Sequence, residues 1–194
     1  PSRLVRARYK VSDILKQSTD GQTGLVVFAG DAFTVAPLTH DTDTIEALLS
    51  PLQPALMPVQ GSRVDLGLQQ AASLMQQAGI QQGDILLVTD GFDGQRALDA
   101  AVQISKDGYR VSVLGVGTDA GAPVPTGRGG YLRDQQGDIV VPSLDQAALK
   151  QLATAGNGAY AAISSGDQDI RYLLSKMTPQ AGERTEQPGM HTDR

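Results

Sequence analysis

The chain has 194 residues, 40% of them hydrophobic, which is enough for one sizeable buried core and too little for two. Lys and Arg number 16 against 21 Asp and Glu, and the resulting net charge of -5 excludes the broad basic surface that nucleic-acid phosphates require. Cysteine is absent, so disulfides, thiolate nucleophiles and Cys-ligated zinc are excluded, whereas the redox compartment stays open.

Strand-like and helix-like patterns alternate along the chain. Continuous apolar runs of strand length are found at 24–29, 32–35, 84–89, 110–117 and 159–163. Apolar residues at helical spacing predict helices within 4–15, 45–49, 64–79, 97–102, 146–156 and 170–177. Gly30 and Asp31 between the first two strands predict a β-hairpin. The alternation is typical of a doubly wound α/β fold with a mainly parallel sheet flanked by helices.

The second half of the chain carries a further hairpin signal. Residues 131–133 and 138–141 flank a Gly-containing turn, which predicts a small hairpin on the surface. Ser143 and Gln146 have the spacing of a reciprocal cap for the helix that follows.

The two ends of the chain differ from the rest. Residues 178–194 are polar and interrupted by Pro and Gly, as linkers are. The chain starts at Pro1 without an initiator Met or a signal-peptide pattern, and no apolar run reaches the roughly 20 residues that span a bilayer. We therefore expect a folded domain over residues 1–177, a linker over 178–194, and an excerpt from a longer protein.

Two polar residues are predicted to lie at the edge of an open parallel sheet where ligands usually bind. Ser62 lies in a loop with Pro and Gly, and Asp90 directly follows the apolar strand 84–89. A hydroxyl and a carboxylate suit a hard cation such as Mg²⁺. By residue types alone, however, a helix cap at Ser62 and a turn at Asp90 are the simpler interpretations.

Five segments carry a family resemblance when they are taken in order: GLVVFAG at 24–30, PLTHD at 37–41, MPVQGS at 57–62, ILLVTDG at 85–91 and LGVGT at 114–118. Together they resemble the von Willebrand factor A (VWA) domains of bacterial Bat-type, aerotolerance-related membrane proteins. The likeness runs from the opening PSRL to the tail PGMHTDR. Each motif alone has little specificity, but the ordered set is specific.

The resemblance implies a metal-ion-dependent adhesion site. In that family, an Asp-x-Ser-x-Ser motif at the end of the first strand binds Mg²⁺ together with a later hydroxyl and a later Asp. Ser62 matches the hydroxyl and Asp90 the Asp, and the other ligands are expected upstream of Pro1. The family's central first strand is expected there too, so strands 24–29 and 84–89 should border a gap. With two ligands, this chain by itself should bind Mg²⁺ weakly or not at all.

The resemblance also implies a function in protein docking. The partner would offer a carboxylate to the cation. The parent protein would lie in the bacterial inner membrane and work with MoxR-type ATPases and other Bat-type proteins in envelope stress or complex assembly, with the side of the membrane left open. We expect no catalytic residue and no organic cofactor site, and therefore no enzyme. A metal-free scaffold is one alternative, and a Mg-dependent phosphatase-like enzyme using Asp90 is a more distant one, because no partner acid or phosphate-binding Lys is evident.

Overall fold

A computed structural model describes residues 3–53, 56–59, 61–92, 94–118, 120–121, 123–124, 126 and 128–177. The elements, in chain order, are α1 (Arg3–Gln17), β1 (Thr23–Phe28), β2 (Ala32–Thr39), α2 (Thr42–Leu49), α3 (Val64–Gln77), β3 (Gly83–Thr89), α4 (Gln95–Lys106), β4 (Tyr109–Gly115), α5 (Gln146–Ala155), β5 (Asn157–Ala162) and α6 (Gln168–Lys176). Each helix and strand expected from the sequence is present, except the small hairpin of 131–133 and 138–141. None of these helices has both the length and the apolar character needed to cross a bilayer.

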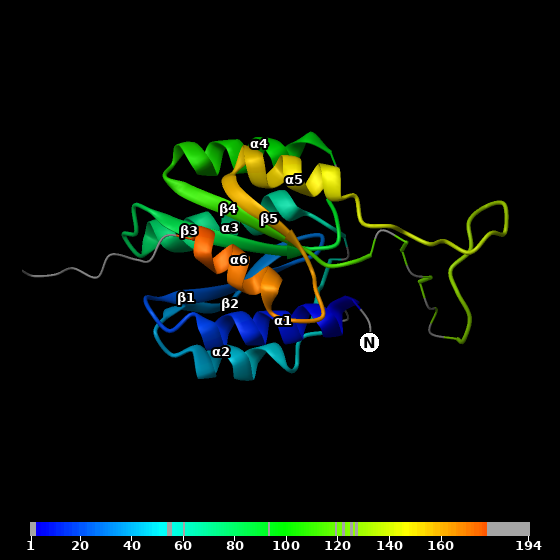
Figure 1. The fold of residues 1–194 in the computed structure, drawn as a ribbon, viewed down its shortest axis with the longest axis horizontal. Coiled ribbons are helices and arrows are strands. Elements are labelled where there is room, and N and C mark those ends of the chain that lie inside the picture. The colour runs from blue at the N-terminus through cyan, green and yellow to red at the C-terminus, as the bar shows by residue number, and fades with distance from the viewer. Residues whose placement is uncertain are drawn as a thin grey trace, which may run out of the picture.

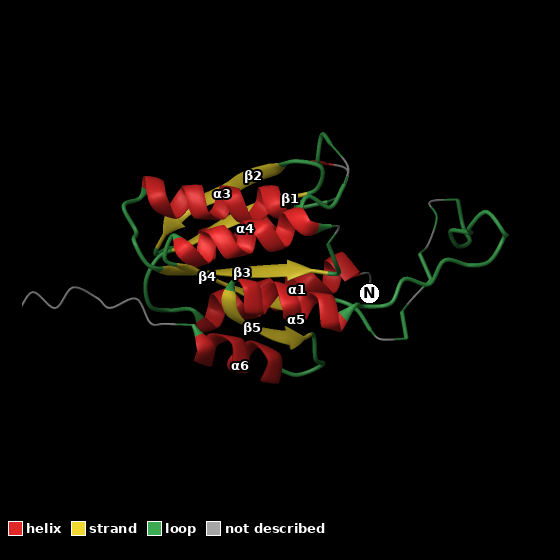
Figure 2. Ribbon diagram, turned by 90° about the horizontal axis from the view of Figure 1, so that it is seen from above, coloured by secondary structure: helices red, strands yellow, loops and turns green. Residues whose placement is uncertain are grey.

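The strands form two separate sheets with helices on both sides (Figures 1 and 2). β1 and β2 pair as the predicted antiparallel hairpin. β3, β4 and β5 form a parallel sheet in that order, with β3 and β4 in register from Gly83 opposite Tyr109 to Thr89 opposite Gly115. The fold is therefore the α/β class with a mainly parallel arrangement that the alternating pattern predicts.

The predicted gap lies between β1 and β3. These strands belong to different sheets, so they are not hydrogen-bonded neighbours. All six residues of β1 are half-buried, whereas six of the seven residues of β4 are buried. A strand inside a sheet is normally covered on both faces, so the exposure of β1 is that of a strand with an open side. The expectation that 24–29 and 84–89 are not directly paired, which a vacant central position requires, is confirmed.

Helix α3 bridges the two sheets on one face. Its buried Leu68 and Met75 belong to the same apolar cluster as Ile85 and Leu87 of β3, and Phe28 of β1 packs against that cluster. An ideal Cβ at Gly67 of α3 would lie 2.7 Å from a ring carbon of Phe28, so the absence of a side chain there lets the ring approach. The larger sheet and the hairpin therefore share one core through α3.

Helix α1 bridges the sheets on the opposite face. Ile14 packs in a cluster with Leu114 of β4, while the next residue, Leu15, packs in a second cluster with Ala36 of β2 and Ile45 of α2. Successive residues of one helix thus contact different sheets. Figure 1 shows α1 running alongside α2 below the hairpin, with α6 above it.

Residues 131–141 form an arm that projects from the domain (Figure 1). A bridge between Arg133 and Ile139 joins its two sides in antiparallel fashion, so the predicted hairpin is reduced to one bridge. Four large apolar side chains of the arm are exposed: Tyr131, Leu132, Ile139 and Val141. The arm therefore presents apolar surface to its surroundings.

Helix α5 is capped differently from the expectation. The N-cap is Asp145, whose carboxylate accepts a hydrogen bond of 3.0 Å from the backbone N–H of Ala148. Gln146 is the first helical residue, so the reciprocal cap predicted from Ser143 and Gln146 is wrong. A carboxylate next to the helix start fulfils the same requirement from a position two residues closer.

A buried ion pair joins α1 to α6. The Lys10 ammonium lies 2.9 Å from an Asp169 carboxylate oxygen, and the two side chains are 9% and 1% exposed. Lys10 also donates to the carbonyl of Gly166, and Asp169 accepts from the backbone N–H groups of Ser164 and Ile170. Burial raises the pKa of the Asp169 carboxyl, but the hydrogen bonds from Lys10 and from the backbone outweigh burial and bring that pKa below its ordinary value.

We expect Asp169→Asn to lower the free energy of unfolding at pH 7 by about 3–5 kcal/mol, because Lys10 would keep a buried charge without a counterion. A carboxyl whose pKa is lowered in the native state stabilises the fold above its ordinary pKa, near 3.8, and loses that contribution as the pH falls through the native value. The difference between wild type and variant in urea unfolding should therefore shrink below about pH 4.

Asp167→Asn is the matched control, since Asp167 pairs with Arg171 on the surface and both side chains are more than half exposed. This substitution should change stability by less than about 1 kcal/mol. Equal losses for the two variants would show that the pair between α1 and α6 does not hold these helices together.

Candidate functional site

The two predicted site residues lie in one hollow. Ser62 and Asp90 both line a depression of about 450 Å³ where the loops after β3 and before α3 meet the foot of the arm. Arg3, Phe92 and Pro142 also line this hollow, which we call the rim. The neighbouring Gln60 and Asp93 lie outside the described residues. The structure therefore brings together side chains that are 28 residues apart in the sequence.

The loop that carries Ser62 is fastened to the end of β1. The backbone N–H of Gly30 donates to Val59 over 2.8 Å, and that of Arg63 donates to Ala29 over 2.7 Å. Gly61 has a φ of +151°, and a Cβ placed on it would lie 2.9 Å from the Cα of Gly30. Only glycine lets the two backbones come this close.

Ser62 is exposed and is not the cap of α3. The N-cap is Arg63, and no side chain there makes a capping hydrogen bond. The helix-cap interpretation of Ser62 is therefore wrong, and Ser62 instead lines the rim. Arg63 instead forms two hydrogen bonds, 2.9 and 2.8 Å long, with the carboxylate of Asp65, which hold the pKa of Asp65 below its ordinary value.

Asp90 is positioned by the residue before it. The hydroxyl of Thr89 donates to the carbonyl of Gly91 over 2.7 Å, and the carbonyl of Thr89 accepts from Val116 over 2.8 Å. These bonds join the turn at Asp90 both to itself and to the end of β4. Thr89 is a positioning residue that sequence reasoning missed, although a hydroxyl directly before Asp-Gly is typical of such turns.

Arg3 reaches the carboxylate of Asp90 from the first turn of α1. One guanidinium nitrogen lies 3.1 Å from an Asp90 oxygen, and another donates to the carbonyl of Pro142 over 2.6 Å. The pair is partly solvated, with side chains 29% and 52% exposed. Nothing in the sequence spacing of Arg3 indicates that it contacts residue 90.

The donors at the rim suit a hard cation in kind but not in number. Ser62 offers a hydroxyl and Asp90 a carboxylate, the oxygen ligands that Mg²⁺ prefers. The other carboxylate in the hollow, Asp145, already caps α5. Within the described ranges, no three His, Cys, Asp or Glu side chains come together as a metal site. On their own, Ser62 and Asp90 would therefore give a cation an incomplete set of ligands.

This architecture is similar to that of known protein domains. The family described as von Willebrand factor type A domain matches residues 1–92. An aerotolerance-related membrane protein from Bacteroides fragilis, known from its crystal structure, is 32% identical in sequence and has a TM-score of 0.82. The alignment covers 91% of this chain and 88% of that protein's chain. BatB from Bacteroides thetaiotaomicron is also 32% identical, with a TM-score of 0.80 and coverage of 90% and 86%. The curated proteins give no match.

A more distant likeness concerns the fold alone. Proximal thread matrix protein 1 from the mussel byssus is 17% identical in sequence, with a TM-score of 0.61. The alignment covers 90% of this chain and 41% of that protein's chain. That protein is described with a zinc-occupied MIDAS motif, the metal-ion-dependent adhesion site.

These likenesses show that the chain belongs to the class of von Willebrand factor type A domains. Within that class the chain belongs to the domains of the Bat-type, aerotolerance-related proteins.

We expect Gly61→Ala to destabilise the loop of Ser62, since the added methyl group meets the backbone of Gly30 and φ is unfavourable for alanine. The cost should be about 1–3 kcal/mol in urea unfolding. Gly166→Ala is the control, because a Cβ there meets no atom within 4 Å, and its effect should stay within about 0.5 kcal/mol. Equal stability of the two variants would mean that the close approach does not constrain the loop.

Proposed function

We propose that the domain is a protein-binding module that docks its partner at the rim of Ser62 and Asp90. The observation that carries this proposal is the convergence of an exposed hydroxyl and a partly exposed carboxylate in one hollow, at the sheet edge where ligands of open α/β folds bind. The described residues there do not combine a nucleophile, a base and an anion-stabilising group.

The chemistry of the rim favours docking through Mg²⁺. When bound, the cation would supply an open coordination position for a carboxylate of the partner. Ser62 and Asp90 would hold it together with ligands of the Asp-x-Ser-x-Ser segment that the family resemblance implies. The zinc-occupied adhesion motif of the mussel protein supports the same use of the fold.

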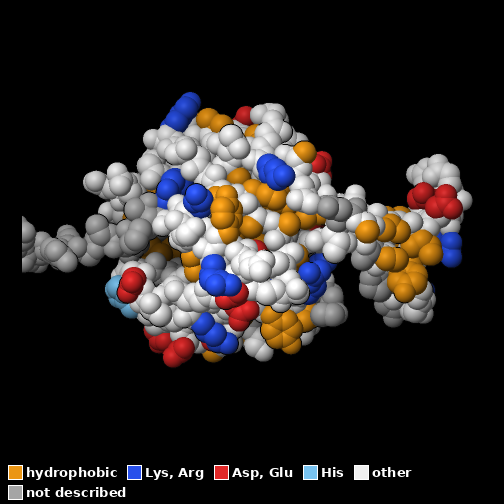
Figure 3. All heavy atoms as spheres, in the orientation of Figure 1, with side chains coloured by type: hydrophobic (Ala, Val, Ile, Leu, Met, Phe, Trp, Pro, Cys, Tyr) orange, Lys and Arg blue, Asp and Glu red, His pale blue; other side chains and the backbone are white. Residues whose placement is uncertain are grey.

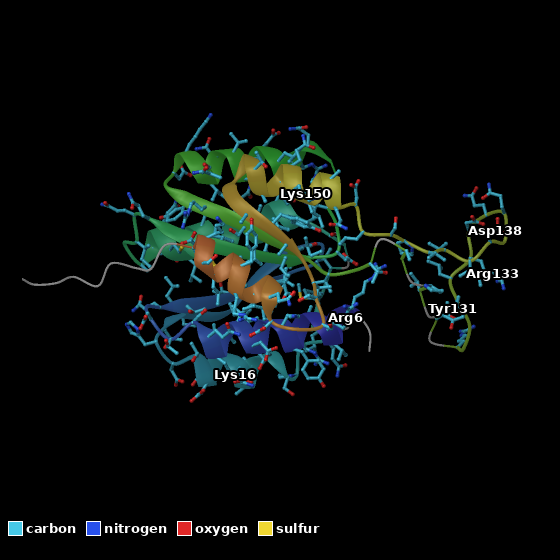
Figure 4. The ribbon with its side chains drawn as sticks, in the orientation of Figure 1. Arg6, Lys16, Tyr131, Arg133, Asp138 and Lys150 are labelled. Atoms are coloured by element: carbon cyan, nitrogen blue, oxygen red, sulfur yellow. The ribbon has the colours of Figure 1, made fainter. Side chains whose placement is uncertain are left out.

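The arm supports a protein partner over a small molecule. Val124 and Pro142 at its foot line the rim, and its exposed Tyr131 and Leu132 lie farther out (Figure 4 labels Tyr131). Apolar side chains displayed beyond a polar site give a partner a large surface to bury. We include MoxR-type ATPases and other Bat-type proteins among the proposed partners, with a parent protein in the inner membrane of a bacterium.

We expect Asp90→Asn to abolish the Mg²⁺-dependent rise in melting temperature of the domain, tested within its complete natural sequence. A cation that binds only the folded state raises stability by mass action, and the amide removes the charge that attracts it. Ser62→Ala should weaken the response and Ser62→Thr should keep it. Thermal melts and calorimetry with and without Mg²⁺ measure both effects.

Asp99→Asn on the exposed side of α4 is the control for the change of charge and should leave the response intact. A wild-type protein without any Mg²⁺ response would make a metal-free scaffold the better account. Turnover of a phosphate monoester that Asp90→Asn abolishes and Asp99→Asn preserves would instead favour the phosphatase-like alternative.

We also expect Arg3→Gln to raise the affinity for Mg²⁺, because its guanidinium lies against the carboxylate that the cation needs. The gain should be about two- to fivefold, the equivalent of a partly exposed ion pair. Arg6→Gln on the same helix makes the same change in net charge and should have a smaller effect. Equal effects of the two variants in calorimetry would mean that Arg3 acts only through the overall charge.

A further inference from the structure

A second hollow, of about 540 Å³, opens at the free edge of the parallel sheet. It is lined by the start of β5, by α5 and α6 and by Arg110 near the start of β4. Asp90 follows the carboxyl end of β3, whereas this hollow lies toward the amino ends of the parallel strands. The two hollows share no lining residue, so the second is separate from the rim.

The second hollow is positively charged in a chain that is acidic overall. Arg110, Lys150 and Lys176 line it, and none of its lining residues is Asp or Glu. Arg110 is paired with Asp84, whereas neither lysine forms an ion pair with a carboxylate in the part of the chain that the structure describes. The two lysine side chains can therefore attract an anionic ligand, although the chain as a whole has a net charge of -5.

Each ammonium group lies near the face of a tyrosine ring. Lys150 Nζ lies 5.8 Å from the centre of the Tyr160 ring, and Lys176 Nζ lies 5.7 Å from that of Tyr172. Contacts of this kind attract a cation to the face of a ring. Tyr172 is 46% exposed, so it also offers apolar area to a ligand.

The two lysines approach β5 from opposite faces of the sheet. Helix α5, which carries Lys150, packs through Leu149 and Leu152 into the core shared with α3 and α4. Helix α6, which carries Lys176, packs through Leu173 into the cluster on the other face. On the face shown in Figure 3, Lys and Arg side chains border an apolar area over β5, and Figure 4 labels Lys150 beside it.

Between the lysines lies a strand edge that an extended chain can follow. Among the described strands β5 has β4 on one side and none on the other. Ala159 donates to the Ser112 hydroxyl and Ile163 donates to Gly115, so these two residues face β4. Because strand residues alternate, the backbone N–H of Ala162 points to the open side. Such an edge accepts a further strand from another chain.

We propose that the edge of β5, with Lys150 and Lys176 on either side, binds an extended acidic segment of a partner protein. Backbone pairing along the strand gives such a segment its register, and Asp or Glu side chains at neighbouring positions, which point to opposite faces, meet the two ammonium groups above and below the sheet. This binding needs neither Mg²⁺ nor the rim, so the domain has a second attachment point at its opposite end.

The probe is a fluorescein-labelled ten-residue peptide in which Glu-Glu pairs alternate with Thr-Thr pairs, so that Glu side chains lie on both faces of the strand, and its matched control has Gln in place of Glu. In anisotropy titrations at low ionic strength, we expect the Glu peptide to bind at least tenfold more tightly than the Gln peptide, with added salt weakening it. Lys150→Gln and Lys176→Gln should each reduce affinity about two- to fivefold, and the double variant about tenfold. Asp90→Asn should have no effect, which separates this site from the proposed function.

Lys106→Gln is the matched control, because Lys106 is exposed at the end of α4 and does not line the hollow. Methylating the amide nitrogens along one edge of the peptide should abolish binding, and methylating those along the other edge should not, since only one edge pairs with β5. Equal binding of the Glu and Gln peptides, or an equal loss with Lys106→Gln, would overturn the proposal. Displacement by inorganic phosphate at matched ionic strength, with methylation of either edge harmless, would overturn it in favour of a simple anion site.

Discussion

Packing of two helices, rather than a shared hydrogen-bonded ladder, holds the two sheets of this domain together. Helix α3 contributes Leu68 and Met75 to a core that includes β3 and contacts Phe28 of the hairpin. On the other face, Ile14 and Leu15 of α1 divide between the parallel sheet and the hairpin. Because the strand ladders stop at β1 and β3, the relative position of the sheets depends on these apolar contacts and on the buried pair that ties α1 to α6.

The geometry of the rim depends on the same helix packing. The loop of Ser62 is hydrogen-bonded to the end of β1, whereas Asp90 follows β3 and is held to the end of β4. The two site residues therefore belong to different sheets, and the bridging helices set how far apart they lie. Helix α1 takes part directly, since its first turn carries Arg3 to the carboxylate of Asp90. A change in the packing of α1 would therefore move the two sheets relative to each other, and it would also move the Arg3 guanidinium that pairs with Asp90.

The two hollows give the domain two ends with different chemistry. The rim presents a hydroxyl and a carboxylate beside an apolar arm, which suits recognition through a cation and a surface. The edge of β5 presents two ammonium groups over tyrosine rings, which suits an acidic chain. A module with attachment points at opposite ends can connect two proteins, and the parallel strands between them provide a rigid spacer.

Local patterns in the sequence were sufficient to predict the helices and strands of the two sheets, because burial leaves a period of 3.6 in the helices and continuous apolar runs in the strands. Ser62 and Asp90 were indicated by the family resemblance of the segments that contain them, because residue types alone favoured a helix cap and a turn. The contact of Arg3 with Asp90, the anchoring of Gly61 on Gly30 and the groove between Lys150 and Lys176 had no local signal. These features join residues that are distant in the chain, and only the packing of α1, α5 and α6 on the strands decides which side chains meet. The cap of α5 at Asp145 rather than Ser143 was likewise decided by where the helix begins in three dimensions, because both residues have the chemistry of a cap.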